Sequence, residues 1–324
     1  MKFKKPYIIA EIGSNFNQNL ETGYNLIKQA KICGADAVKF QLFKAKILYP
    51  NNKKMFKIFK SIELSHSMFK SFFKFAKKLK LDVSASVFDE QSAKFLSKFN
   101  IDFNKLASSE ISNLKLLNLL SKIKKPILIS TGMSNLKDVQ QAVQICEKNK
   151  NKNIAILQCG SLYPLPIRKV NLNSLKTYSK NFNYVLGFSD HTLDDVAAIT
   201  SLGLGARVFE KHITLDKKSE GPDHFYAMEP KQFKNYVTRI RKAYLSLGNK
   251  KKDLLPEEKT NSRREGMYYK KNFKKDEKIS KKDIFFKRPP LGLTPAYLNE
   301  ITNRYLTRNV KKNSPIFIKD FKNK

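Results

Sequence analysis

The sequence has few cysteines and no long apolar run. Its three cysteines, Cys33, Cys146 and Cys159, stand far apart and form no CxxC pair. Disulfide frameworks and zinc knuckles need paired cysteines, so we expect neither. No segment approaches the roughly 20 consecutive apolar residues of a membrane-spanning helix, and the basic N-terminus passes directly into a strand rather than into the apolar core of a signal peptide. We therefore expect a cytoplasmic protein without membrane contacts.

Acidic residues are also scarce. Asp and Glu number 28 against 63 Lys and Arg, which gives a net charge of +35. Such an excess is typical of proteins that bind nucleic acid or an anionic membrane. The lysines are nevertheless spread over every predicted helix and loop, and no Arg-Gly or aromatic-basic array occurs. We interpret the charge as a solvated lysine surface and predict no nucleic-acid partner; a polyanion-binding protein is the alternative.

No GxGxxG motif follows the first predicted strand, which argues against a dinucleotide-binding doubly wound sheet. Apolar strands and amphipathic helices instead alternate eight times within about 245 residues, close to the ~250 of a (β/α)8 barrel. The sequence therefore predicts an α/β protein with a TIM barrel, and a doubly wound sheet is the alternative. The predicted strands are Tyr7–Ile12, Asp36–Gln41, Val83–Ser86, Phe103–Ala107, Pro126–Ser130, Ile154–Gln158, Tyr184–Phe188 and Ala206–Phe209.

Beyond Gly248 the pattern changes. Residues 249–261 are charged and lack apolar periodicity, which is typical of a linker. We therefore assign residues 1–248 to the barrel and residues 262–324 to a small β-rich domain. About 60 residues are marginal for independent stability, so we expect this domain to dock on another surface. Its strand-like pieces are Met267–Tyr269, Ile284–Phe286 and Ile316–Ile318.

Two histidines follow consecutive predicted strands. His191 comes shortly after Tyr184–Phe188, and His212 comes shortly after Ala206–Phe209. Consecutive strands of a parallel barrel are neighbours with the same direction, so the two imidazoles can converge on one divalent metal, with carboxylates or water as the remaining ligands. The alternative is a pair of surface or hydrogen-bonded histidines.

Polar residues gather at the predicted strand ends, where a barrel builds its active site. Lys39 and Lys105 lie inside otherwise apolar strands and need anions nearby. They can bind a phosphate group, or they can pair internally with Glu11, Glu110 or Glu210. The strand-end residues are Glu11, Lys39, Gln41, Ser86, Lys105, Ser108, Glu110, Ser130, Thr131, Tyr163, Ser189, Asp190, His191, Glu210, His212 and Asp223.

Nine motifs follow one another along nearly the whole chain: EIGSN, VKFQ, KLASSE, ISTGMS, CGSLYPLP, GFSDHT, EKHITLD, GPDH and KRPPLGLTP. This array closely resembles the sialic acid (nonulosonic acid) synthase family. The resemblance implies a barrel followed by an antifreeze-like, or SAF, domain that caps the partner's active site in a domain-swapped homodimer. It also implies condensation of phosphoenolpyruvate with N-acetylmannosamine, or with a diacetamido-trideoxyhexose to give legionaminic or pseudaminic acid.

The resemblance further implies roles for the matching residues. A divalent cation, Mn²⁺ or Mg²⁺, would be held by His191 and His212. The implied catalytic residues are Glu11, Glu110 and Lys105, and either glutamate could position or deprotonate the attacking water. Phosphoenolpyruvate would be bound by Lys39, Gln41, Lys105, Ser108, Ser130 and Ser189. The amino sugar would be contacted by Glu110, Ser161, Tyr163, Asp223 and the C-terminal Arg288 of the partner.

The chain departs from the family pattern at several positions. Ser161 stands where the best-known members have Asn, and Pro290 interrupts the RPGxG pattern after Arg288. Two further functions stay open on the sequence alone. One is condensation of phosphoenolpyruvate with a phosphorylated sugar by a related barrel. The other is a barrel without catalytic activity that binds polyanions.

Overall fold

The computed structural model describes residues 3, 5–259 and 263–322. By its internal contacts the chain divides into two compact units, Met1–Gly248 and Asn249–Lys324. Residues 260 and 261 of the predicted linker, and Ser262 at the predicted start of the C-terminal domain, lie outside the described residues. Within the described ranges, no helix combines the length and apolarity needed to cross a membrane.

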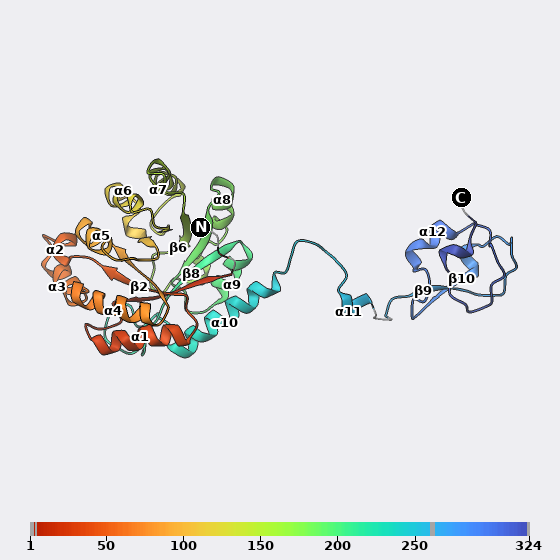
Figure 1. Cartoon of the computed structure of the whole chain (residues 1–324), viewed down its shortest axis with the longest axis horizontal. Coiled ribbons are helices and arrows are strands. Elements are labelled where there is room, and N and C mark those ends of the chain that lie inside the picture. Colours follow the sequence, from red (N-terminus) through yellow and green to blue (C-terminus); the bar gives the residue numbers. More distant parts are fainter. Residues whose placement is uncertain (1–2, 4, 260–262, 323–324) are drawn as a thin grey trace. The chain divides into compact units, whose positions relative to one another are not determined.

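Eight parallel strands close into a barrel in the first unit (Figure 1). Each strand pairs with its neighbour in sequence, and β8 returns to β1 with Glu11 opposite His212. This confirms the predicted (β/α)8 barrel, and the alternative of a doubly wound sheet is wrong. The strands are β1 (Tyr7–Gly13), β2 (Ala37–Leu42), β3 (Asp82–Val87), β4 (Asn104–Leu106), β5 (Ile127–Ser130), β6 (Ile154–Cys159), β7 (Val185–Asp190) and β8 (Ala206–His212).

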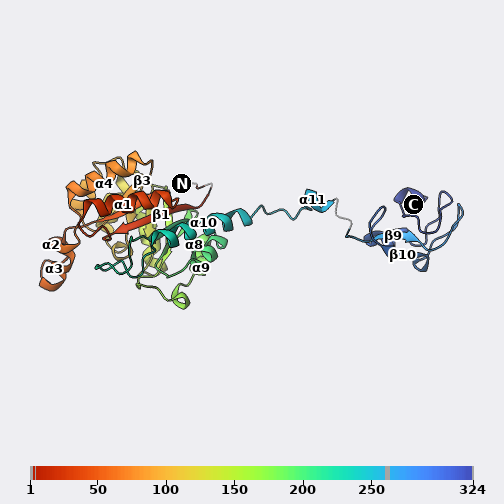
Figure 2. The ribbon, with the colours of Figure 1, turned by 90° about the horizontal axis from the view of Figure 1, so that it is seen from below.

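Helices surround the barrel and bury one apolar face against it. In α1, for example, the Asn19 side chain caps the first turn, while Leu26, Ile27 and Ala30 are buried. The connection after β2 forms two short helices that the sequence did not predict, and both lie at one edge of the unit (Figure 2). The helices of this unit are α1 (Leu20–Ile32), α2 (Ala45–Leu48), α3 (Lys53–Ser61), α4 (His66–Lys78), α5 (Glu90–Leu96), α6 (Leu114–Lys122), α7 (Leu136–Lys148), α8 (Ser174–Asn181), α9 (Val196–Gly203) and α10 (Pro230–Ser246), with 3₁₀ turns η1 (Ser108–Glu110) and η2 (Ile167–Lys169).

The barrel interior changes character along the strands. One buried cluster that includes Ile9, Ala37 and Val208 is entirely apolar. Side chains alternate sides along a strand with a period of two, so the next inward positions on these strands are Glu11, Lys39 and Glu210. An apolar layer therefore fills the amino-terminal part of the barrel and supports a charged layer at the carboxyl ends of the strands.

The second unit is small and has little regular structure. Its two strands, β9 (Gly266–Tyr269) and β10 (Ile284–Lys287), pair antiparallel. The third predicted strand, Ile316–Ile318, is reduced to an isolated bridge between Pro315 and Tyr268, because the chain turns into a 3₁₀ segment at Ile318. The remaining elements of this unit are α11 (Pro256–Lys259), α12 (Leu298–Ile301), η3 (Lys281–Asp283), η4 (Pro295–Tyr297) and η5 (Ile318–Asp320).

Candidate active site

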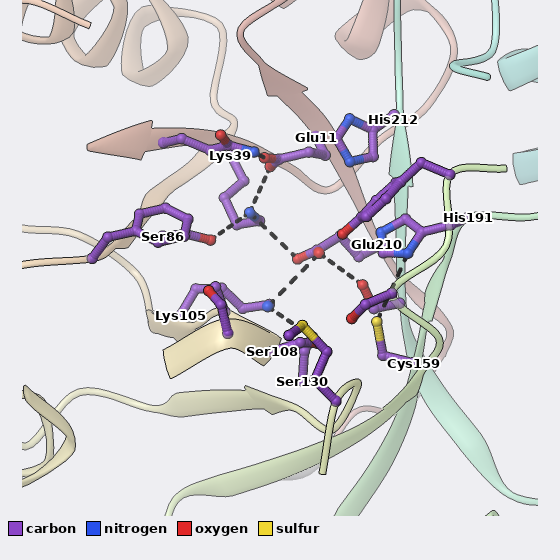
Figure 3. A pocket seen from close by; sticks show the side chains of 18 residues that line it. Glu11, Lys39, Ser86, Lys105, Ser108, Ser130, Cys159, His191, Glu210 and His212 are labelled. Carbon is purple, nitrogen blue, oxygen red and sulfur yellow. Dashed lines mark hydrogen bonds and ion pairs between the residues drawn. The ribbon is translucent and has the colours of Figure 1, made fainter. Parts of the chain in front are cut away.

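A cavity of about 270 Å³ opens at the carboxyl ends of the barrel strands (Figure 3). All eight strands, or the residues that directly follow them, contribute to its wall, as expected for the active site of a TIM barrel. The lining residues are Glu11, Lys39, Gln41, Ser86, Phe88, Lys105, Ala107, Ser108, Ser109, Ser130, Met133, Cys159, Ser161, Tyr163, Ser189, His191, Glu210 and His212.

Each of the two cavity lysines is held by a serine from the adjacent strand. The Nζ of Lys39 donates to Ser86 Oγ at 2.7 Å and lies 2.7 Å from Glu11 Oε2. The Nζ of Lys105 donates to Ser130 Oγ at 2.8 Å and to the Leu106 carbonyl oxygen at 3.1 Å. The short serine side chains on β3 and β5 thus fix where the two ammonium groups lie.

Glu210 lies between the two lysines and forms an ion pair with each of them. Its Oε2 lies 3.8 Å from Lys39 Nζ, and its Oε1 lies 3.8 Å from Lys105 Nζ. Ser189 donates a hydrogen bond of 3.0 Å to Glu210 Oε1. The internal lysine pairing that the sequence left open is therefore present with Glu11 and Glu210.

The two buried carboxylates differ in acidity. Burial raises the pKa of Glu11 to about 7, with Glu210 adding to the rise and Lys39 opposing it. Burial also acts on Glu210, but the charges of Lys105 and Lys39 overcome it and hold its pKa at about 2. Near neutral pH, Glu210 is therefore a fixed anion, whereas Glu11 can gain or lose a proton.

The two predicted metal ligands lie side by side in the cavity wall, with ring centroids 5.6 Å apart. The Nδ1 of His191 lies 2.8 Å from the Gly160 carbonyl oxygen. When Nδ1 donates its N–H to this oxygen, the Nε2 atom of the ring carries the lone pair. The Nδ1 of His212 is buried without a hydrogen-bond partner among the described residues. Burial lowers the pKa of His212 to about 3, so this ring is neutral near pH 7.

These features fit a divalent cation, because metal-binding imidazoles must be neutral with an available lone pair. In the part of the chain that the structure describes, no three His, Cys, Asp or Glu side chains form a metal-binding group. A cation at the two histidines would therefore need further ligands from water or from a substrate.

A corner of small residues adjoins this pair of histidines. The Gly132 backbone N–H donates to Ser108 Oγ at 3.0 Å. A Cβ at Gly132 would lie 2.3 Å from Ser161 Oγ and 2.8 Å from Ser108 Oγ, so a larger residue here requires both serine side chains to shift. The Oγ of Ser161 is buried without a hydrogen-bond partner among the described residues and is available to a ligand in the cavity.

The structure brings together most of the predicted site residues. Those that line the cavity are Glu11, Lys39, Gln41, Lys105, Ser108, Ser130, Ser161, Tyr163, Ser189, His191 and His212. Glu110 is not among the lining residues; it lies at the end of η1 and accepts a hydrogen bond of 2.9 Å from the Asn113 side chain. Asp223 lies just outside the lining, where Ser14 Oγ and Tyr226 OH donate to it at 3.1 and 2.7 Å.

Arg288 belongs to the second unit. Its side chain is exposed and lines a surface pocket of that unit together with Arg263 and Arg264. The predicted role of Arg288 in contacting a sugar bound in a partner's barrel stays a prediction.

Three cavity features escaped the sequence-based choice of site residues. Glu210 was recognised at a strand end but was not chosen, although its place two residues before His212 puts both on the same face of β8. Cys159 was considered only as a cysteine without a CxxC partner, yet it lines the cavity and its Sγ lies 3.9 Å from His191 Nδ1. Tyr226 packs its ring 5.0 Å from that of His212, and no sequence pattern indicated this contact.

Comparisons with known proteins cover both units. The NeuB family model matches residues 26–252, and the SAF domain model matches residues 264–322. An uncharacterized protein of Methanocaldococcus jannaschii is 38% identical over 321 residues, which span 98% of this chain and 95% of that protein. The N,N'-diacetyllegionaminic acid synthase of Campylobacter jejuni is 34% identical over 331 residues, 97% of this chain and 99% of that protein.

A human relative and a solved structure extend the comparison. The human N-acetylneuraminate-9-phosphate synthase is 34% identical over 265 residues, 77% of this chain and 73% of that protein. The crystal structure of N-acetylneuraminic acid (sialic acid) synthetase from Leptospira borgpetersenii, in complex with citrate, superposes with a TM-score of 0.76 at 26% identity. It covers 79% of this chain and 90% of that chain.

Proposed function

Because the chain belongs to the NeuB family, we propose that it condenses phosphoenolpyruvate with the aldehyde of an N-acetylated amino sugar to give a nonulosonic acid and phosphate. The predicted family, the C-terminal SAF domain and the assignment as an enzyme of the sialic acid synthase type are confirmed. The observation that carries the proposed reaction is the placement of two lysines, two glutamates and two histidines around one cavity.

Phosphoenolpyruvate supplies the nucleophilic carbon, and its anionic groups need cations in the cavity wall. The cationic side chains among the lining residues are Lys39 and Lys105, and a serine hydroxyl already holds each of them in place. Ser108, in the turn after β4, and Gln41, on β2, can complete the anion's hydrogen bonds. Such preset charges stabilise an anion without reorganising during the reaction.

His191 and His212 would hold the divalent cation, and Mn²⁺ or Mg²⁺ is the proposed ion. When bound, such an ion polarises a carbonyl oxygen as a Lewis acid, which makes the aldehyde carbon electrophilic. The protein's part is to orient both imidazoles. The Gly160 carbonyl oxygen orients the His191 ring, and burial keeps His212 neutral.

Glu11 is the side chain best suited to move a proton. The reaction joins C3 of the donor to the aldehyde carbon, adds water at C2 and breaks the bond between C2 and the phosphate oxygen. Glu11 lines the cavity, and its pKa of about 7 lets it accept a proton from the attacking water near neutral pH. Glu110 is less well placed, because it lies outside the lining and is bonded to Asn113.

The acceptor would meet Ser161 and Tyr163 at the mouth. A free amino sugar, either N-acetylmannosamine or a diacetamido-trideoxyhexose, suits this cavity better than a sugar phosphate. Both lysines are needed for the donor, and the lining holds no further lysine or arginine for a second phosphate group. A phosphorylated acceptor is the alternative, and it stays in the test because the human relative is an N-acetylneuraminate-9-phosphate synthase.

We also propose that the protein acts as a homodimer in which the SAF domain of one copy covers the barrel of the other. The loops at the carboxyl ends of the strands expose several large apolar side chains, which are better covered than left in water. These side chains are Met133, Leu162, Ile167, Leu193 and Phe225. Light scattering of the full chain gives twice the monomer mass if this proposal holds, and the monomer mass if it does not.

Product analysis tests the proposed reaction. The protein is incubated with Mn²⁺, phosphoenolpyruvate and one acceptor at a time, and the mixture is resolved by mass spectrometry. The proposal predicts a product equal in mass to the acceptor plus pyruvate, formed from a free N-acetylated sugar. Product formed only from phosphorylated aldoses would replace it with the alternative.

A further inference from the structure

Glu210 occupies a special position between the two lysines of the cavity. Its two carboxylate oxygens face different ammonium groups, each at 3.8 Å. Lys39 has Glu11 as a second partner, whereas Lys105 pairs with no other carboxylate within the described ranges. The side chains of all three residues of this bridge are at least nine-tenths buried. Glu210 is therefore the carboxylate that both buried ammonium groups share, while Glu11 is the closer partner of Lys39.

The contact acts through charge rather than through hydrogen bonds. A separation of 3.8 Å exceeds hydrogen-bond distance, and Glu210 Oε2 has no hydrogen-bond partner among the described residues. Each ammonium group has three N–H donors. Lys39 uses two on Ser86 and Glu11, and Lys105 uses two on Ser130 and Leu106. One N–H of each lysine thus stays available for an anion in the cavity.

Burial works against this arrangement. It lowers the pKa of the Lys105 ammonium, and the charge of Glu210 is the largest influence that opposes the loss of its proton. A neutral amine binds an anionic group far less well than an ammonium group does. The charge of the cavity wall therefore depends on a carboxylate that has no hydrogen bond to either lysine.

We propose that Glu210 is a positioning residue that keeps Lys39 and Lys105 charged and fixed toward the cavity, so that together they bind the anionic groups of the donor. The binding of the donor by the two lysines rests on the proposed function, whereas the effect of Glu210 on their charge does not. Other titratable groups face these lysines or Glu210 from neighbouring strands and loops. These groups are Glu11, Cys159, His191, His212 and Asp223. In Glu210→Gln, Glu11 loses a repulsion that raises its pKa, so it holds its negative charge to lower pH and replaces part of the charge that Glu210 supplied.

The effect on the lysines is measurable without any substrate. Reductive methylation attacks only neutral amines, and peptide mass spectrometry reads its extent at each lysine as a function of pH. In Glu210→Gln we expect methylation of Lys105 to begin at least about one pH unit lower than in the parent, a tenfold larger neutral fraction at a given pH. Glu210→Asp, which keeps the charge, should restore most of the parental onset. Equal onsets in parent and Glu210→Gln would overturn the proposal.

Glu63 provides a matched control. It also bridges two lysines, Lys44 at 3.1 Å and Lys60 at 3.3 Å, but it does not line the cavity. Glu63→Gln removes the same charge from a more exposed bridge between two lysines and should leave the methylation onset of Lys105 unchanged. A shift of similar size in Glu63→Gln would mean that net charge, rather than the position of Glu210, sets the reactivity.

Anion binding gives the second readout, with inorganic phosphate and phosphoenolpyruvate titrated separately by calorimetry. At pH 6.5 we expect Glu210→Gln to bind phosphate at least as tightly as the parent, because one negative charge fewer faces the ligand. At pH 8.5 its affinity should be at least about tenfold weaker than that of the parent. A pH-independent affinity ratio would overturn the positioning role. If phosphate follows this pattern but phosphoenolpyruvate does not bind the parent, the proposed function fails and the role of Glu210 stands.

Discussion

The Nζ of Lys39 lies 2.7 Å from Oε2 of Glu11, and both side chains are almost completely buried at the centre of the barrel. A buried ion pair costs desolvation, which its mutual attraction only partly returns, so it is weak support for a stabilising role. Its position in the wall of a cavity that draws on every strand of the barrel indicates a functional one. The pair places an anion-binding cation beside a carboxylate that titrates near neutral pH.

Replacing Lys39 by Met tests the linkage between these two residues. Without the cation, the pKa of Glu11 in the folded protein should rise further above its unfolded value. The folded state then holds a proton that the unfolded state has released, so the free energy of unfolding falls as pH rises from about 4.5 through the folded pKa. Urea denaturation from pH 5 to 8.5 should show a steeper decline for Lys39→Met than for the parent. The exposed Lys312→Met is the control and should follow the parent; parallel curves for Lys39→Met would contradict the pairing.

Protonation of Glu11 should lower kcat/KM on the acidic side of the pH profile. If its carboxylate accepts the proton of the attacking water, kcat/KM rises with pH through a midpoint near 7 and then levels. Glu11→Gln should lower kcat by about 10²–10⁴-fold and abolish this rise with pH, because the amide cannot accept the proton. The test is a profile of kcat/KM recorded over pH 5.5–9. If kcat/KM of Glu11→Gln still rises with pH as in the parent, the base is another residue.

Gly132 should be essential to the anion site although it has no side chain. In Gly132→Ala the new Cβ would collide with Ser161 Oγ and Ser108 Oγ and displace the serine that the Gly132 N–H holds. We expect the KM for phosphoenolpyruvate to rise at least about tenfold, equivalent to ~1.4 kcal/mol of binding energy. Gly203→Ala, whose Cβ would meet nothing within 4 Å at the end of α9, should leave it unchanged. Equal KM values for the parent and Gly132→Ala would contradict the geometry of this corner.

Arg288 tests the proposed participation of the SAF domain. Arg288→Ala should raise the KM for the amino sugar by at least about tenfold while changing the KM for phosphoenolpyruvate less than about twofold, because one hydrogen bond to a charged group contributes ~1.5–3 kcal/mol. Initial-rate kinetics with each substrate varied in turn separate the two effects. The exposed Arg168→Ala serves as the matched control. Equal effects on both substrates would count against a cap that contacts the sugar alone.

Much of the barrel was predictable because each repeat carries its own local signal. The strand Ala37–Leu42 reads as AVKFQL, and its period-two alternation already separates inward Lys39 and Gln41 from outward Val38 and Phe40. The same rule applied to β8 puts Glu210 on the inward face with His212. The sequence left open that Glu210 pairs with a lysine, but it could not predict that one carboxylate bridges both, because this depends on how β2, β4 and β8 face one another across the barrel.

Other features depended on local geometry that sequence patterns do not carry. The connection after β2 interleaves lysines and aromatic residues, yet Asn52 caps a short helix there by accepting from the Met55 N–H. Glu110 was expected to face the cavity from its place after β4. The 3₁₀ turn Ser108–Glu110 instead keeps Ser108 in the lining and leaves Glu110 bonded to Asn113.

The most direct test of the proposed reaction is phosphate release from phosphoenolpyruvate, measured with Mn²⁺ for N-acetylmannosamine, its 6-phosphate and diacetamido-trideoxyhexoses, with and without chelator. We predict release that depends on a free N-acetylated sugar, stops with chelator, returns when Mn²⁺ is added back, and is nearly lost in His212→Ala without loss of the fold by circular dichroism. Release that is independent of any sugar, or that persists unchanged in chelator and in His212→Ala, would contradict the proposed condensation at this cavity.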